Sequence, residues 1–406
     1  MHAVPQDADT RAPWEITRRQ MAVEWFEIEN VPRHAEAAVS HFRGASGIAE
    51  SHVTVCLKDK CADPAGALED AWLAALDAAG LSPESTLLRR VFHHASHGFD
   101  AELARFAHAH PGSFSVIGQP PLPGGQLAVW SQHLRDPRAP LVTSGGGTCF
   151  SCTRGNLRHH WLTALCDTTG DDPASQAARI LEQHDHWLSA QDMKLADHVV
   201  RTWWFVRDID RDYQALVDVR RGFFATHQLT EDTHYIASTG IAGGHDQASA
   251  RMSLDSYAIA GLGRDQVEYL SAPEHLGPTH HYGVTFERAT AISYADRKHV
   301  IISGTASIDP TGEIVHPGNV MRQLDRSLEN VSALLDAAGA GLDDLAMILV
   351  YLRDPADGAE IRKALRERFR RLPTIVLHAP VCRPGWLVEV EGIALVSAKN
   401  PGLPEI

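Results

Sequence analysis

Two carboxylates, Glu389 and Glu391, stand one residue apart in the hydrophobic stretch CRPGWLVEVEG at 382–392. Side chains alternate across a β-strand, so a strand here places both carboxylates on one face, and something polar must occupy that face. Apolar neighbours raise the pKa of a carboxylic acid, which suits it to proton transfer near neutral pH. The stretch therefore has two interpretations, a catalytic acid or solvated and ion-paired strand carboxylates.

A second chemical signal comes from Tyr213 and Arg220 in DYQALVDVRRGFFATHQ, which the pattern predicts to be a helix. Positions seven apart lie nearly on one helix face, so both side chains can address one cavity. The guanidinium fork of arginine matches a carboxylate better than the lysine ammonium does. The alternative is that the arginine lies on a solvated helix face.

The elements that position these residues belong to an internal repeat. The letters LDAAG occur at 76–80 and at 335–339, each inside an amphipathic run that ends at glycine. The surroundings repeat as helix, strand, helix, strand, strand, and a weaker copy covers the middle of the chain. Alternating helices and strands with long crossovers predict an α+β fold of mixed β-sheets with helices packed on one face.

Pro- and Gly-rich stretches near 136–147 and at 271–283 predict linkers. They divide the chain into three units, which the prediction places at 1–140, 141–275 and 276–406.

Composition limits the partners of the chain. Its 406 residues are 44% hydrophobic and 22% charged, with a formal net charge of −14 and no Lys/Arg run, so a small molecule is expected as partner rather than nucleic acid. No apolar stretch approaches the ~18 residues that span a bilayer, and residues 1–20 lack the apolar region of a signal peptide. We therefore expect a cytoplasmic protein without membrane contact, and its six cysteines fit a reducing compartment.

A possible zinc site begins with Cys149 and Cys152 and continues with His159 and His160. The sequence lacks a second ligand pair at structural-zinc spacing, and the segment is better explained as a β-hairpin. We expect neither a metal nor a cofactor.

Two sequence words, IISGTASI at 301–308 and LVEVEGIALV at 387–396, resemble the YjgF/Rid family. Over residues 145–398 the chain further resembles the chorismatases, which build on that fold, through RTWWFVRDID, ASTGIAG, FERAT, GNVMRQLDRSLENV and CRPGWLVEVEG. The first unit resembles only a generic, non-catalytic Rid unit. HHYGVTFERAT is shorter than its chorismatase counterpart and has no proline, which leaves the identity of the substrate open.

The resemblance implies roles for individual residues. Glu389 falls on the catalytic glutamate of chorismatases, and the corresponding residue of the first copy is Val129, so the fold itself does not require an acid there. Arg220 and Arg362 fall on substrate-binding arginines that would hold the two carboxylates of chorismate. A solvated helix face is the alternative for both arginines.

Four more positions carry weaker implications. Gln323 and Arg288 match residues near the chorismatase site, with helix capping and a strand-edge charge as their alternatives. Gly304 and Cys382 match the pair typical of chorismatases that make 3-hydroxybenzoate, where the glycine gives the ring room and the thiol is a nucleophile or proton carrier. Cys382 is otherwise a small buried residue.

The leading hypothesis is an enzyme that converts chorismate, a small dianion, to 3-hydroxybenzoate or a dihydroxycyclohexadiene carboxylate, and pyruvate. The alternatives are a Rid-type enamine or imine deaminase and a non-catalytic small-molecule-binding protein. Rid proteins are trimers with sites between subunits, so the three units predict either a monomer with an internal pseudo-trimer or a homotrimer.

Overall fold

The computed structural model describes residues 23–94 and 101–406, and three six-stranded sheets organise them. The predicted absence of a signal peptide concerns residues 1–20, which lie outside this range. Each sheet is built in the same way, from an antiparallel three-stranded meander followed by helix, strand, helix, strand and strand. The repeat predicted from the sequence is thus confirmed and starts earlier than expected, at the meander.

The first sheet has the order β1-β2-β3-β6-β4-β5, with β4 parallel to β5 and the other pairs antiparallel. Its elements are β1 (Val23–Ile28), β2 (Ala35–Arg43), β3 (Ala49–Leu57), α1 (Pro64–Ala78), β4 (Thr86–His93), α2 (Ala101–Ala109), β5 (Ser113–Gly118) and β6 (Leu127–Arg135).

The second sheet repeats this order as β11-β10-β12-β9-β8-β7. Its elements are β7 (Val142–Gly146), β8 (Cys149–Arg154), β9 (Leu157–Cys166), α3 (Pro173–Ser189), α4 (Leu195–His198), β10 (Val199–Val206), α5 (Ile209–Thr226), β11 (Ala237–Ala242) and β12 (Met252–Ala260). The pairing of β8 with β9 is the hairpin predicted for the segment with the two cysteines.

The third sheet has the order β13-β14-β15-β18-β16-β17. Its elements are β13 (Val267–Leu270), β14 (Ala289–Ser293), β15 (Arg297–Ala306), α6 (Val320–Ala337), β16 (Leu345–Leu352), α7 (Gly358–Phe369), β17 (Thr374–His378) and β18 (Val388–Ser397). β13 precedes the predicted boundary at 275/276 but pairs with β14. The Pro-rich segment 271–283 therefore connects two strands of one sheet.

The glycine ends of the repeated helices follow from backbone conformation. α1 begins after Asp63, whose side chain accepts a hydrogen bond from the Gly66 amide, and it ends just before Gly80. Gly80 and Gly339, the last letters of the two LDAAG words, both have positive φ, at 65° and 72°. Glycine adopts this conformation without steric cost, so it ends a helix cleanly.

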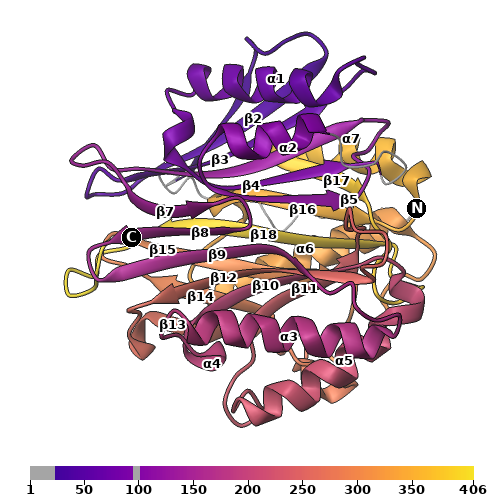
Figure 1. Ribbon diagram of the computed structural model, residues 1–406. Helices are drawn as coiled ribbons and strands as arrows, with labels where there is room; N and C mark the ends of the chain where they lie inside the picture. Colours follow the sequence, from indigo (N-terminus) through magenta and orange to yellow (C-terminus); the bar gives the residue numbers. More distant parts are fainter. Residues whose placement is uncertain (1–22, 95–100) are drawn as a thin grey trace, which may run out of the picture.

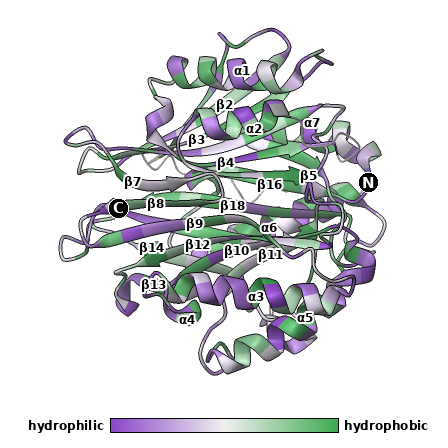
Figure 2. Cartoon of the chain, viewed as in Figure 1, coloured by the Kyte–Doolittle hydropathy of each residue, from purple (hydrophilic) through white to green (hydrophobic). Residues whose placement is uncertain are grey.

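Helices cover the outside of the molecule and the sheets occupy its centre (Figure 1). α1 and α2 lie on one side and α3, α4 and α5 on the opposite side, while Figure 2 shows hydrophobic residues along many of the central strands. One core cluster draws buried side chains from all three sheets, including Trp130, Trp203 and Val350. None of the helices in the described part of the chain is both long and apolar enough to cross a membrane.

A buried polar contact joins each pair of units, and together these contacts give the units a cyclic order. Arg90 of the first unit pairs with Asp255 of the second at 2.8 Å, and Arg201 of the second pairs with Glu391 of the third at 2.7 Å. His299 of the third unit lies 2.8 Å from Glu50 of the first, which closes the ring. The three units therefore form a pseudo-threefold arrangement within one chain.

Candidate functional site

A cavity of about 210 Å³ lies between the second and third units. The second unit lines it with α5 and β11, and the third lines it with β15, β18 and the segments before β14 and β18. Six of the eight site residues predicted from the sequence lie on its wall: Tyr213, Arg220, Arg288, Gly304, Cys382 and Glu389.

Glu389 is an acid whose environment favours its protonated form. Its side chain is 4% exposed, and no described residue donates a hydrogen bond to its carboxyl group. Burial, followed by the negative charge of Glu391, raises the pKa of Glu389 to about 8, although Arg201 and Arg288 oppose the shift. A carboxyl group with such a pKa holds its proton at neutral pH and can deliver it to a ligand.

Glu391 has the opposite environment, because charged and polar groups of the second unit surround it. It accepts hydrogen bonds from Arg201 at 2.7 Å and Trp203 at 2.9 Å, and a further one from the Thr239 hydroxyl. All these donors lie on β10 and β11. The ion-paired interpretation of Glu391 is therefore the correct one, and this carboxylate connects β18 to the neighbouring unit.

Thr239 carries this connection toward the cavity. Its hydroxyl oxygen accepts hydrogen bonds from Arg201 at 2.6 Å and from the backbone N–H of Gly304 at 2.9 Å. The cavity wall thus has a fixed hydrogen-bonded scaffold behind Glu389, which limits how far the two units can shift relative to each other.

Arg220 and Arg288 supply positive charge to the cavity. The Nε atom of Arg220 donates to the Thr285 hydroxyl at 3.2 Å, while its buried Nη2 atom has no hydrogen-bond partner within the described residues. Arg288 donates to the Gly277 carbonyl from Nη2 at 2.9 Å, and it lies against the rings of Tyr282 and Phe286. A buried guanidinium with a spare donor favours an anionic ligand, because an unpaired buried charge is costly.

Tyr213 and Cys382 form a neutral edge of the cavity. Burial raises the pKa of the Cys382 thiol to about 12, and the nearby negative charge of Glu389 adds to the shift. Burial also raises the pKa of Tyr213 well above its usual range. Both groups are therefore protonated at neutral pH, so Cys382 offers a thiol hydrogen-bond donor and not a resting thiolate.

Gly304 leaves room for the close approach of Glu389. A Cβ atom at this position would lie 2.1 Å from Oε1 of Glu389 and 3.1 Å from the Thr239 methyl carbon. A larger residue would thus push the carboxyl group out of its position.

Two predicted residues do not reach the cavity. Gln323 is fully buried, and its amide donates to the carbonyls of His316 and Gly385 while accepting from the Leu387 amide. It anchors the segment before β18, and Asn319 makes the side-chain cap of α6. The prediction that Gln323 contacts the substrate is corrected to a supporting role.

Arg362 lies elsewhere in the molecule. It lines a different cavity, between the third and first units, where it pairs with Glu36. The prediction that Arg362 and Arg220 hold one substrate is therefore corrected. The physical reason is the cyclic order of the units, because α7 faces the first unit while α5 faces the third.

Several lining residues were missed by the sequence reasoning. Tyr282, Arg383 and Trp386 line the cavity, and the Arg383 guanidinium lies 5.2 Å from the ring centre of Tyr282 and 5.1 Å from that of Trp386. Arg383 and Trp386 belong to the CRPGW word already singled out, so adjacency to Cys382 was an available signal. Tyr282 lies in the segment that departs from the chorismatase pattern.

The residues considered for zinc lie on β8 and β9. Within the described ranges, no group of three or more His, Cys, Asp or Glu side chains is arranged to hold a metal ion.

Comparisons with known proteins identify the family that shares this fold. Residues 288–396 match the family model described as endoribonuclease L-PSP. A RutC family protein of Pyrococcus abyssi is 37% identical over 126 residues, which cover 30% of this chain and 90% of that protein. The chain therefore belongs to the RutC family, within the YjgF/Rid group.

Two longer relatives match about half of the chain. A chorismatase of Streptomyces rapamycinicus is 31% identical over 221 residues, and a 3-hydroxybenzoate synthase of Streptomyces hygroscopicus is 30% identical over 224 residues. Each match covers 48% of this chain and 63% of the relative. A crystal structure of a chorismatase is 18% identical, with a TM-score of 0.59 over 77% of this chain and 93% of that one, which shows a shared fold.

Proposed function

We propose that this chain is a chorismatase-like enzyme that converts chorismate to 3-hydroxybenzoate, or to a dihydroxycyclohexadiene carboxylate, and pyruvate. The observation that carries the proposal is that the buried acid Glu389 and the guanidinium of Arg220 line one small cavity. Its support from sequence is the identity of about 30% to a chorismatase and a 3-hydroxybenzoate synthase.

The chemistry of the substrate explains why such a pair is suitable. Chorismate has two carboxylates and an enol ether, so its binding needs two cationic holders and its cleavage needs a proton at the enolpyruvyl methylene carbon. Arg220 and Arg288 are the proposed holders, and Arg288 takes the role expected of Arg362. Glu389 is the proposed proton donor because its pKa is about 8.

In the proposed reaction, the Glu389 proton forms a C–H bond with the methylene carbon and leaves an oxocarbenium ion. Arg288 and Arg201 stabilise the carboxylate that Glu389 becomes. An oxygen of water or of the ring hydroxyl then adds to the oxocarbenium carbon and returns a proton to Glu389. In the hydrolytic reaction, the bond between this carbon and the ether oxygen then breaks, the ether oxygen stays on the ring and takes the proton from Glu389, and the added oxygen becomes the carbonyl oxygen of pyruvate after its proton passes to Glu389. In the reaction without water, the former ring hydroxyl oxygen leaves the ring carbon and becomes the pyruvate carbonyl oxygen. The ether oxygen stays on the ring and takes the proton from Glu389, and the ring becomes aromatic as the carbon that bears this oxygen loses its proton to Glu389. Hydrolysis consumes one water, whereas formation of hydroxybenzoate consumes none.

Gly304 and Cys382 bear on the choice of product. Because Gly304 has no side chain, the Glu389 carboxyl group can lie close to the ring of the proposed substrate. The protonated Cys382 thiol can donate a hydrogen bond to a substituent of that ring. We assign 3-hydroxybenzoate as the main product on this basis.

The test is to incubate the purified full chain with chorismate, follow pyruvate with lactate dehydrogenase and NADH, and identify the ring product by mass spectrometry. We expect pyruvate release that Glu389→Gln abolishes and Glu360→Gln, a change at an exposed site on α7, leaves intact. Absence of pyruvate with the wild-type protein would refute the proposal.

A second candidate is hydrolysis of enamines or imines, which the similarity to a 3-aminoacrylate deaminase RutC of Acinetobacter baylyi, 29% identical over 99 residues, favours. It uses the same anion holder and the same acid, with water attacking an iminium carbon. Ammonia release from freshly generated 2-aminoacrylate, without pyruvate release from chorismate, would favour this candidate.

A further inference from the structure

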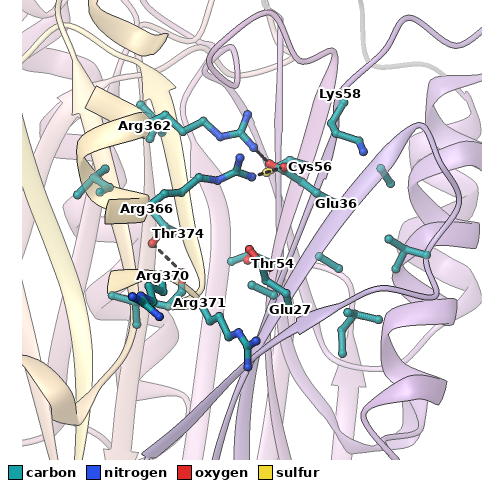
Figure 3. A pocket seen from close by; sticks show the side chains of 18 of the residues that line it. Glu27, Glu36, Thr54, Cys56, Lys58, Arg362, Arg366, Arg370, Arg371 and Thr374 are labelled. Carbon is teal, nitrogen blue, oxygen red and sulfur yellow. Dashed lines mark hydrogen bonds and ion pairs between the residues drawn. The ribbon is translucent and has the colours of Figure 1, made fainter. Parts of the chain in front are cut away.

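A second cavity, with a volume of about 760 Å³, lies between the third and first units (Figure 3). Its wall combines α7 and β17 of the third unit with β2 and β3 of the first. The candidate active site is built in the same way at the interface between the second and third units, where α5 and β11 of the second unit face the third unit.

Backbone contacts confirm that the two cavities occupy equivalent interfaces. Leu122, in the segment before β6, donates its amide to Val376 of β17 at 2.8 Å and lines the larger cavity. Similarly, Ala242 at the end of β11 donates its amide to Pro380 at 3.1 Å, next to Cys382 of the candidate active site. The strand registers place Ala128 in the position of Glu389, because Ala128 lies opposite Phe92 of β4 as Glu389 lies opposite Tyr351 of β16. The sequence alignment of Glu389 with Val129 is thus wrong by one residue, and the larger cavity has no counterpart of the proposed acid.

The larger cavity is strongly basic, in contrast to the net charge of −14 of the whole chain. Its lining includes three carboxylates and six cationic side chains, the latter being Arg33, Lys58, Arg362, Arg366, Arg370 and Arg371. Within residues 23–94 and 101–406, only Arg362 and Arg366 of these six form ion pairs, and both pair with Glu36. Such an excess of cations inside a concavity attracts a small anion.

Glu36 shows which anion chemistry fits. Its carboxylate reaches from β2 to two guanidinium groups on successive turns of α7, and Figure 3 shows Arg362 and Arg366 both directed at it. Arg366 lies 2.6 Å from the carboxylate and is 54% exposed, so this pair remains accessible from the cavity. The carboxylate of Glu36 thus marks a position that a ligand carboxylate can take. Apolar side chains, including Leu122, Leu365 and Phe369, supply a wall for a hydrocarbon body.

We propose that this cavity is a second, non-catalytic binding site for a small aromatic or cyclic carboxylate, which displaces Glu36 from Arg362 and Arg366. The proposal is independent of the reaction at the candidate active site. A displacing ligand gains the two forked donors, and Glu36, which is already 27% exposed, can turn to solvent.

The test titrates isophthalate, a benzene ring with two carboxylates, into the full chain by isothermal calorimetry. Arg220→Ala is the background, so that the candidate active site does not add to the signal. We expect saturable binding at one site, at least tenfold weaker in Arg362→Ala and in Arg366→Ala, and about tenfold tighter in Glu36→Gln, which removes the competing charge. Lys363→Ala is the matched control, because it removes one exposed charge from α7 outside this cavity and should leave the affinity unchanged.

Three outcomes would overturn the proposal. They are the absence of saturable binding, an affinity that neither arginine change weakens, and a Glu36→Gln protein that binds more weakly, which would show that Glu36 only holds the arginines in place. Inorganic phosphate provides a further arm: if phosphate saturates the site and isophthalate does not, the carboxylate class is wrong. Circular dichroism of each variant identifies a misfolded protein, and the nearly isosteric Glu36→Gln change provides a second variant if Arg362→Ala does not fold.

Discussion

Replacing Glu389 with glutamine tests the raised pKa through folding stability, separately from activity. Below pH 4.5 the carboxyl group is protonated in both the folded and the unfolded chain. Folding then buries a neutral group, and its titration does not lower the free energy of unfolding. Between pH 4.5 and the folded pKa of about 8, the unfolded chain releases the proton and the folded chain keeps it. The free energy of unfolding therefore falls by about 1.4 kcal/mol per pH unit over this window.

The whole pKa shift of Glu389 lowers the free energy of unfolding by at most about 5 kcal/mol, and this limit is reached above pH 8. Glutamine keeps the shape of the side chain but cannot ionise, so Glu389→Gln lacks this penalty. We expect the variant to gain stability relative to the wild type as pH rises from 5 to 9 and to show little advantage at pH 4.5.

The assay is urea denaturation of both proteins at intervals of one pH unit, with Glu360→Gln as the control for loss of an exposed carboxylate. Groups other than Glu389 titrate in both proteins, so the difference between the two unfolding free energies isolates this residue. A difference that stays constant from pH 5 to pH 9 would refute the reasoning, because it would mean that Glu389 ionises as an ordinary exposed acid.

The other predictions concern the remaining parts of the site. Chorismate turnover by the wild type should be steady below pH 8 and decline above it, as Glu389 loses its proton, and a pH profile of pyruvate release measures this. Gly304→Ala should lower kcat by about 10²-fold with an unchanged melting temperature, because the new methyl displaces only the end of the Glu389 side chain. Arg220→Lys should raise KM about tenfold with a smaller change in kcat, since it keeps the charge but loses the fork. Glu391→Gln should destabilise the fold by about 3 kcal/mol in thermal or urea denaturation, because Arg201 would lose its buried partner.

The repeat made most of the fold predictable from the sequence. Helix ends at glycine and the long crossovers between strands are local signals, and the structure confirms both. The edge strand β7 escaped prediction because its sequence, VTSGG, is exposed and rich in glycine, and Val142 is 67% exposed. An edge strand has only one partner and no buried face here, so hydrophobic alternation could not reveal it.

The candidate site was predictable only in part, because it depends on which units are neighbours. The spacing of Tyr213 and Arg220 placed two side chains on one face of α5, and both line the cavity. The same logic could not place Arg362, since a helix pattern gives the exposed face but not the unit that it faces. In the ring, α7 faces the first unit, so Arg362 meets Glu36 and lies outside the candidate active site.

The two carboxylates of β18 show how one strand face can meet two different environments. Glu391 accepts hydrogen bonds from Arg201 and Trp203 of the second unit. Glu389, one residue apart on the same face, meets the cavity instead, and the fixed negative charge of Glu391 helps to raise its pKa. The ion pair that joins the units is thus also part of what keeps the neighbouring acid protonated. A change in the contact between the second and third units should therefore alter acid chemistry in the cavity even when no lining residue is replaced.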